Sequence, residues 1–100
     1  LSFAMNAGLD TDKLLEAISG GAAQSWQMVN RGETMVKGEF DFGFAVDWMQ
    51  KDLRICLEEA KSNGADLPVT EIVAEYYAEL SADGYGRSDT SSLIRRLHDF

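Results

Sequence analysis

The chain has 100 residues, of which 45% are hydrophobic and 26% charged. These proportions are those of a globular domain and exclude a disordered chain. Its formal net charge is -8, from 9 basic and 17 acidic residues. Lys and Arg are not clustered, so a nucleic-acid partner is not expected. No apolar run approaches the roughly 18 residues of a membrane span, so a membrane partner is not expected either.

Cysteine and histidine each occur once, as Cys56 and His98. A single cysteine cannot form an internal disulfide, which favours a reducing compartment, the cytoplasm. Cys56 falls on the apolar face of a predicted helix, so we expect a buried thiol. We expect His98 to be a solvated or helix-end side chain. Metal binding needs several ligands at short spacing, so no metal site is predicted.

The first residues of the chain have the pattern of the end of a helix. Gly8 occupies the position at which a left-handed C-terminal cap is expected. The chain starts within this helix at Leu1 and has no initiating Met. We therefore expect that further sequence precedes Leu1 in the same protein.

Two helical stretches and a loop are predicted next. A short helix over 10–19 has Asp10 as its N-cap. A second stretch covers 22–37, in which Gly32 predicts a kink or a division into two shorter helices. The loop covers 38–43 and has the sequence GEFDFG.

Three further helices are predicted in the second half of the chain. The longest covers 45–62 and ends at Asn63-Gly64. The next has Pro68 in its first turn and reaches about residue 82. Its apolar residues recur at helical spacing, namely Val69, Ile72, Val73, Tyr76 and Leu80. The last helix is capped by Asp89 or Thr90. No strand is predicted, so the fold class is all-α, a compact bundle of about five or six helices with a radius of gyration near 13 Å.

The helix over 45–62 has two apolar faces. The first is a core stripe, made of Val46, Met49, Leu53, Cys56, Leu57 and Ala60. The second consists of Trp48 and Ile55, with Asp52 and Glu59 beside it and Lys51 at its border. Two interpretations are open: another helix of this domain covers Trp48 and Ile55, or they face a further domain, a second subunit or a ligand. In the second case, Lys51 and Asp52 border a site.

Three segments of the chain carry a resemblance to a known family. They are LLEAISGGAAQSW at 14–26, FDFGFAVDWMQKDL at 40–53 and DTSSLI at 89–94. In this order they resemble the helical domain of the 3-hydroxyisobutyrate dehydrogenase family, β-hydroxyacid dehydrogenases related to 6-phosphogluconate dehydrogenase. The second segment is the most specific, because Gly-Phe precedes Lys-Asp-Leu in a long helix. The resemblance implies that residues 1–100 are the C-terminal helical domain of a larger enzyme with a Rossmann domain.

The resemblance also implies a reaction and a site. Family members use NAD or NADP to interconvert a small β-hydroxyacid and its semialdehyde, in a cleft between the Rossmann and helical domains. The lysine of the Lys-Asp-Leu motif contacts the cofactor, and it corresponds to Lys51. The aspartate after it and the phenylalanine of the Gly-Phe pair border the substrate, and they correspond to Asp52 and Phe44. The general acid/base lysine of the family lies upstream, so no catalytic residue is expected in this chain.

Two functions are open from the sequence. The first is half of a dehydrogenase active site together with an oligomer surface. Family members usually associate through their helical domains, so a homodimer or higher homo-oligomer is expected. The second is a non-enzymatic helical interaction or assembly module derived from the same family. The substrates that the resemblance implies are 3-hydroxyisobutyrate-like or tartronate semialdehyde-like.

Overall fold

Every regular element of the protein is helical. The computed structural model describes all of residues 1–100. The elements are α1 (Ser2–Asn6), α2 (Thr11–Ile18), α3 (Trp26–Lys37), α4 (Val46–Asn63), α5 (Pro68–Leu80), a π-helical segment η1 (Ser81–Tyr85) and a 3-10 helix η2 (Thr90–Arg96). The all-α class predicted from the sequence is confirmed. No helix has both the length and the apolar character needed to cross a membrane.

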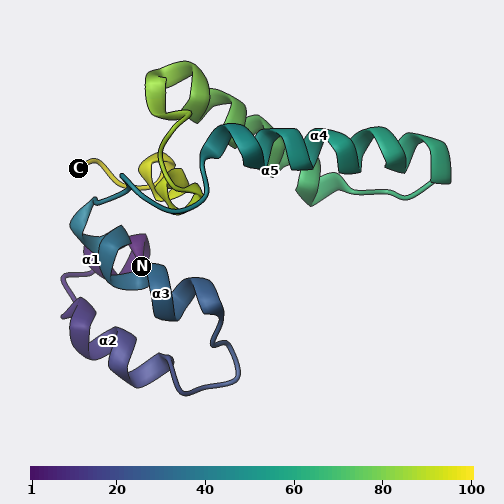
Figure 1. Ribbon diagram of the computed structural model, residues 1–100. Helices are drawn as coiled ribbons and strands as arrows, with labels where there is room; N and C mark the ends of the chain where they lie inside the picture. Colours follow the sequence, from purple (N-terminus) through teal and green to yellow (C-terminus); the bar gives the residue numbers. More distant parts are fainter.

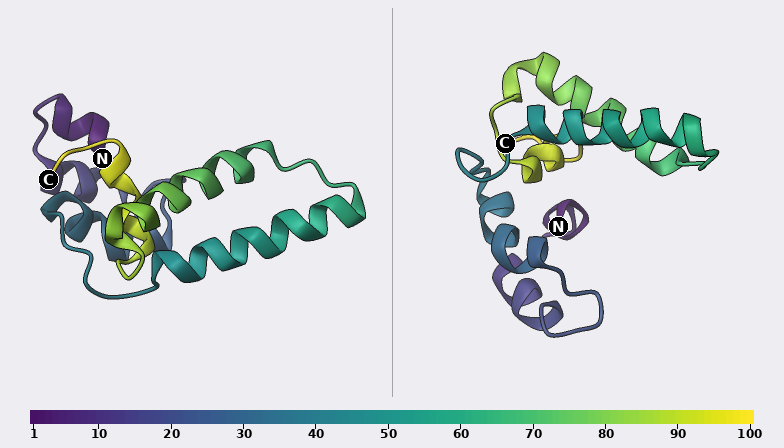
Figure 2. Two further views of the ribbon diagram at one scale, coloured as in Figure 1. Left: turned by 90° about the horizontal axis from the view of Figure 1, so that it is seen from above. Right: turned by 45° about the vertical axis from the view of Figure 1, so that its right-hand side comes forward.

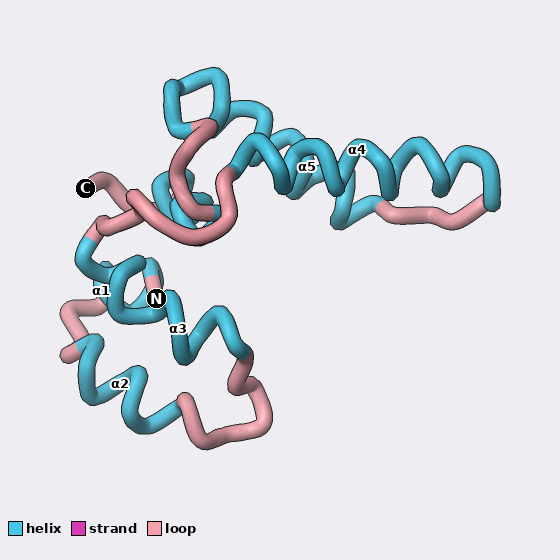
Figure 3. Tube along the Cα trace, viewed as in Figure 1, coloured by secondary structure: helices cyan, strands magenta, loops and turns pink.

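The helices form two arms that meet near η2. The first arm consists of α1, α2 and α3, and the second consists of α4 and α5, which lie side by side (Figures 1 and 2). The loop that joins α4 to α5 lies at the far end of the second arm (Figure 3). η2 contacts α3, α4 and α5 and so connects the arms. The radius of gyration is 15.0 Å. Because a compact domain of this length has a radius of about 13 Å, the bundle is more extended than expected.

Local sequence chemistry sets most helix ends. The Asp10 carboxylate accepts a hydrogen bond from the Lys13 backbone N–H at 3.1 Å and caps α2. Gly64 ends α4 with a φ of 81°, a left-handed conformation that favours glycine. Pro68 is the first residue of α5, where the missing N–H costs no helical hydrogen bond. These ends agree with the sequence predictions.

The prediction for α3 is wrong in two respects. The helix begins at Trp26, after the Ser25 cap, and not at residue 22. It also continues through Gly32 without a break. Gly32 is buried, and a Cβ added to it would lie 2.8 Å from Leu15 Cδ2. The glycine therefore allows α2 to pack closely against α3, and this tertiary contact outweighs its low helix propensity.

The main core lies where the second arm meets η2. Its members are Val46, Tyr77 and Leu80, with Met49, Leu53, Val73 and Leu93 packed against them. The Tyr77 hydroxyl donates to the Thr90 carbonyl at 3.0 Å and joins α5 to η2. Val69 and Ile72 are 70% and 48% exposed, because the first turns of α5 extend beyond η2. The apolar stripe predicted for α5 is therefore buried only toward its C-terminal end.

Candidate functional site

The second apolar face of α4 is exposed. Trp48 is 51% exposed and Ile55 is 50% exposed. Phe44, which lies just before α4, is 46% exposed. These values contradict the interpretation in which another helix of the domain covers Trp48 and Ile55. The alternative, in which this face contacts something outside the chain, stays a prediction.

The three residues that the resemblance implies lie just before α4 and about two turns along it. Phe44 lies at the loop-to-helix junction, and Lys51 and Asp52 follow in α4 with exposed side chains. The Lys51 ammonium lies 5.8 Å from the centre of the Trp48 ring, within reach of a cation–π interaction. Neither Lys51 nor Asp52 takes part in an ion pair of the chain. Both charges are therefore free to interact with an external group.

Lys51 also borders a groove between α4 and α5. The groove has a volume of about 600 Å³. Its charged lining residues are three cations and two carboxylates, namely Lys51, Arg54, Lys61, Asp47 and Glu58. Cations exceed carboxylates in this groove although the chain as a whole carries a net charge of -8. This side of α4 therefore suits an anionic group in spite of the negative charge of the whole chain.

A buried carboxylate, Asp89, holds the backbone at Phe44. Asp89 is 1% exposed. Its Oδ1 accepts a hydrogen bond from the Phe44 N–H at 2.9 Å. Its Oδ2 accepts hydrogen bonds from Arg31 Nε at 3.2 Å and from the Ser91 N–H at 3.0 Å, and the Ser91 hydroxyl donates to the same oxygen. The sequence predicts Asp89 only as a helix cap, which it is, and its contacts with Phe44 and Arg31 were missed.

Backbone hydrogen bonds join the same two segments. The Thr90 N–H donates to the Phe44 carbonyl at 2.8 Å, and the Asp89 N–H donates to the Phe40 carbonyl at 2.8 Å. Ala45 and Asp89 form an isolated antiparallel bridge. The start of α4 is therefore held by the segment that leads into η2.

Arg31 is the counter-ion of Asp89. Its guanidinium lies 4.9 Å from the centre of the Trp26 ring and 5.0 Å from that of Phe42. Gly43 has a φ of 74°, and a Cβ at this position would collide with the Asp89 carboxylate and the Arg31 guanidinium. Glycine at 43 is thus required both by the backbone conformation and by the close approach of the ion pair.

Hydrogen bonding holds the pKa of the Asp89 carboxyl below its ordinary value. Burial alone acts to raise this pKa. The hydrogen bonds from Ser91 and from the Phe44 N–H, together with the Arg31 charge, outweigh burial and lower it. Asp89 is therefore a carboxylate at neutral pH.

The pKa of the Tyr77 hydroxyl is raised above its ordinary value. Burial is the larger cause, and the negative charge of Asp89 adds to it.

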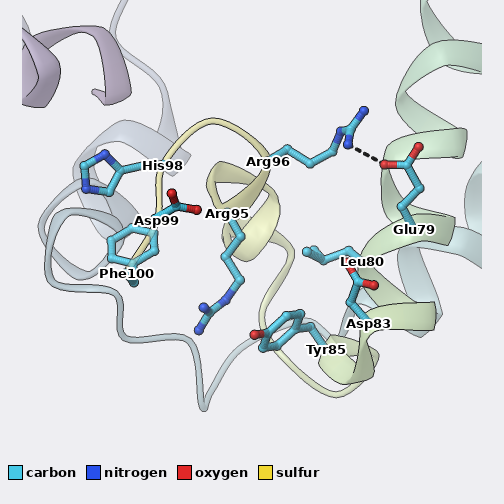
Figure 4. A pocket seen from close by; sticks show the side chains of 9 residues that line it. All are labelled: Glu79, Leu80, Asp83, Tyr85, Arg95, Arg96, His98, Asp99 and Phe100. Atoms are coloured by element: carbon cyan, nitrogen blue, oxygen red, sulfur yellow. Dashed lines mark ion pairs between the residues drawn. The ribbon is translucent and has the colours of Figure 1, made fainter.

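Two other hollows do not suit a charged cofactor. An apolar groove of about 480 Å³ lies between the arms and has no charged side chain in its lining. A pocket of about 350 Å³ lies beside the C-terminal segment (Figure 4). Its charged lining residues are Glu79, Asp83, Asp99, Arg95 and Arg96. Arg96 forms an ion pair with Glu79, and Arg95 lies 4.3 Å from the centre of the Tyr85 ring. Carboxylates outnumber arginines there, so an anion is disfavoured.

Cys56 departs from its prediction. Its side chain is exposed, whereas the helical wheel placed it on the core stripe. The reason is that the outer half of α4 extends along the second arm, where α5 covers only one side of it. No group of three or more His, Cys, Asp or Glu side chains lies close enough together to hold a metal ion.

The structure defines an all-helical domain with an exposed apolar and charged face on α4. The family described as NAD-binding of NADP-dependent 3-hydroxyisobutyrate dehydrogenase matches residues 1–97. The chain belongs to this family.

Individual relatives agree with the family match. An uncharacterised oxidoreductase of Shewanella frigidimarina is 58% identical over 97% of this chain and 33% of its own length. The 2-hydroxy-3-oxopropionate reductase of Escherichia coli is 36% identical over 97% of this chain and 33% of its own length. The crystal structure of 3-hydroxyisobutyrate dehydrogenase from Salmonella typhimurium superposes with a TM-score of 0.85 at 29% identity, covering 95% of this chain and 33% of that one. The chain spans about a third of the length of these relatives.

Proposed function

We propose that residues 1–100 are the C-terminal helical domain of an NAD(P)-dependent dehydrogenase that interconverts a small β-hydroxyacid and its semialdehyde. The observation that supports the proposal is that Phe44, Lys51 and Asp52 are all exposed at or near the start of α4 in a chain of this family. The names of the relatives support a substrate such as 3-hydroxyisobutyrate or 2-hydroxy-3-oxopropionate. The proposal assigns the Rossmann domain and the general acid/base lysine to sequence outside this chain.

The chemistry divides naturally between this chain and the rest of such an enzyme. The cofactor supplies hydride transfer, so the protein has to bind and orient the two reactants. Lys51 provides positive charge for phosphate, ribose or carboxamide oxygens of the cofactor. Asp52 binds a substrate hydroxyl. Phe44 is apolar and half-exposed at the start of α4, and it excludes water from the closed cleft.

Lys51→Ala and Asp52→Asn are expected to have different kinetic effects in the full-length protein. Lys51→Ala removes a charge-assisted contact worth about 1.5–3 kcal/mol, so the apparent KM for the cofactor should rise roughly tenfold to hundredfold. Asp52→Asn should lower kcat/KM for the hydroxyacid more than it changes cofactor binding. Steady-state kinetics with NAD and NADP over a panel of small β-hydroxyacids measures both effects.

Matched variants control for the loss of a surface charge. Lys13→Ala removes an exposed lysine of the first arm, and Glu16→Gln neutralises an exposed carboxylate of the same arm. Neither should change the kinetics. An unchanged cofactor KM in folded Lys51→Ala would make Lys51 a surface cation only. A full-length protein without turnover on any hydroxyacid would overturn the proposal and favour a non-enzymatic interaction module. Residues 1–100 alone should show no turnover.

The proposal also includes self-association as a homodimer or higher homo-oligomer. Phe3 is 84% exposed in α1, and Trp48 and Ile55 leave a second apolar patch uncovered on α4. Exposed apolar patches on folded chains commonly mark contact sites. Twofold pairing is the commonest way for identical chains to cover such a surface. Sedimentation equilibrium of the chain at physiological salt, over a range of concentrations, is expected to show dimers.

Salt provides an internal control for this association. At a net charge of -8, repulsion between chains should weaken the dimer at low salt. A single species near the chain mass of 11.0 kDa at high micromolar concentration would contradict the prediction.

The proposal places the protein in the cytoplasm, since its one cysteine is free and exposed.

A further inference from the structure

The contacts of Asp89 extend beyond the cap of a short helix. We propose that Asp89 is a positioning residue for the substrate site, which fixes Phe44 at the start of α4 and fastens α4 to α3 through Arg31. Asp89 does not touch the reactants itself, because it is 1% exposed. This inference rests on the proposed function, in which Phe44 borders the substrate.

The first step concerns the backbone of Phe44. Both of its polar backbone groups are bound by consecutive residues: the N–H donates to Asp89 Oδ1 at 2.9 Å, and the carbonyl accepts from the Thr90 N–H at 2.8 Å. The side chain of Phe44 remains 46% exposed. The ring is therefore free to contact a ligand, while hydrogen bonds to Asp89 and Thr90 fix the backbone that orients it.

The second step concerns the junction of the two arms. The Asp89 carboxylate joins α3, the loop before α4 and η2, through Arg31, Phe44 and Ser91 respectively. These elements meet where the arms diverge (Figure 1). α3 and α4 share few direct contacts, so the path through Asp89 and η2 sets how α4 lies against the first arm.

The third step concerns what the site tolerates. The two oxygens of Asp89 accept four donors, from Phe44, Arg31 and two groups of Ser91. An asparagine has one acceptor oxygen and one NH2 group. Either orientation of its amide turns the NH2 toward at least one donor. Asp89→Asn therefore keeps the size of the side chain and removes its ability to satisfy the site.

The positioning role predicts a kinetic signature that general destabilisation does not produce. In the full-length protein, Asp89→Asn should lower kcat/KM for the hydroxyacid roughly tenfold to hundredfold, the effect of a small misplacement of a reacting group. The KM for the cofactor should change less than about twofold, because Lys51 lies two turns further along α4. Phe44→Ala should show the same pattern, a large loss in kcat/KM for the hydroxyacid and a small change in KM for the cofactor.

A double-mutant cycle shows whether the effect passes through Phe44. If it does, Phe44→Ala combined with Asp89→Asn should be no worse than Phe44→Ala alone, because the coupled effects do not add. Glu79→Gln breaks the exposed ion pair between Glu79 of α5 and Arg96 of η2, and it should leave all kinetic constants unchanged. Two single effects that multiply in the double variant would overturn the positioning role. Equal losses for hydroxyacid and cofactor would overturn it as well.

A milder variant covers the case in which Asp89→Asn fails to fold. Ser91→Ala removes only the hydroxyl bond to Asp89 and leaves the Ser91 N–H bond in place. It should give the same split with a several-fold loss of hydroxyacid kcat/KM, and unchanged kinetics would overturn the inference. Turnover by the wild-type protein tests the proposed function separately. If the wild type turns over and these variants show no split, only the positioning role fails.

Discussion

Asp89→Ala is expected to lower the free energy of unfolding by about 3–5 kcal/mol at pH 7, the usual cost of breaking a buried ion pair from one side. The Arg31 side chain is only 18% exposed and would lose its counter-ion. The N–H groups of Phe44 and Ser91 would lose their acceptor at the same time. Urea unfolding followed by circular dichroism measures the difference from the wild type.

The pH dependence of this difference follows from the lowered pKa of Asp89. A carboxyl whose pKa is lower in the folded state than in the unfolded state stabilises the fold only while it is ionised. Its contribution is complete above the ordinary value of 3.8 and is lost as the pH falls through the lowered value. The gap between wild type and Asp89→Ala should therefore stay constant down to about pH 4 and shrink below it.

An exposed ion pair provides the control for this result. Glu79→Ala removes the partner of Arg96, and both side chains are well exposed, so the loss should stay below about 1 kcal/mol. A gap for Asp89→Ala as small as that for Glu79→Ala would show that the buried carboxylate does not stabilise the junction. A gap that persists undiminished well below pH 3 would show that its charge is not the cause.

The sequence predicted three helix ends correctly, because each of them depends on a few neighbouring residues. Asp10 caps α2 with its own side chain, Gly64 supplies the left-handed conformation after α4, and Pro68 opens α5. The two apolar faces of α4 were also predicted from periodicity, and the exposure of Trp48 and Ile55 shows that no other helix of the chain covers them. All of these features are local in the sequence.

The features that were missed depend on residues far apart in the chain. Gly32 is a packing glycine only because Leu15 meets it across two helices. Cys56 is exposed because α5 covers one side of α4 and nothing covers the other. Helical periodicity predicts the side of the helix on which a residue lies, but not which other helix packs there or how far it reaches. Neither the packing of Gly32 nor the exposure of Cys56 could therefore be predicted from periodicity.

The candidate site shows the same division. Lys51, Asp52 and Phe44 were identified because they share one short motif. Asp89 was identified only as a cap, since the pattern of an acidic residue followed by Thr-Ser is sufficient for that role. Its bonds to Phe44 and Arg31 span 45 and 58 residues, and no local pattern carries that information. The only local sign of this contact was the glycine at position 43, between Phe42 and Phe44, which leaves room for the Asp89 carboxylate.

Gly43→Ala is expected to lower the free energy of unfolding by about 2–5 kcal/mol, and Gly64→Ala by about 1–2 kcal/mol. The two glycines have similar left-handed backbones, with φ of 74° and 81°. A Cβ at Gly64 meets nothing within 4 Å, whereas one at Gly43 collides with Asp89 and Arg31. The shared backbone strain cancels in the comparison, so the excess at Gly43 measures the close approach of the ion pair.

The excess should depend on the presence of Asp89. Removing the carboxylate removes the main group with which the new Cβ collides, so adding Gly43→Ala to Asp89→Ala should cost little more than Gly64→Ala costs in the wild type. Urea unfolding of the wild type, the three single variants and the double variant measures this coupling. Equal losses for Gly43→Ala and Gly64→Ala in the wild type would contradict the prediction, and they would mean that the loop before α4 moves away from Asp89 at little cost. In that case the hydrogen bond between Asp89 and Phe44 would not be rigid enough to fix the position of the phenylalanine ring.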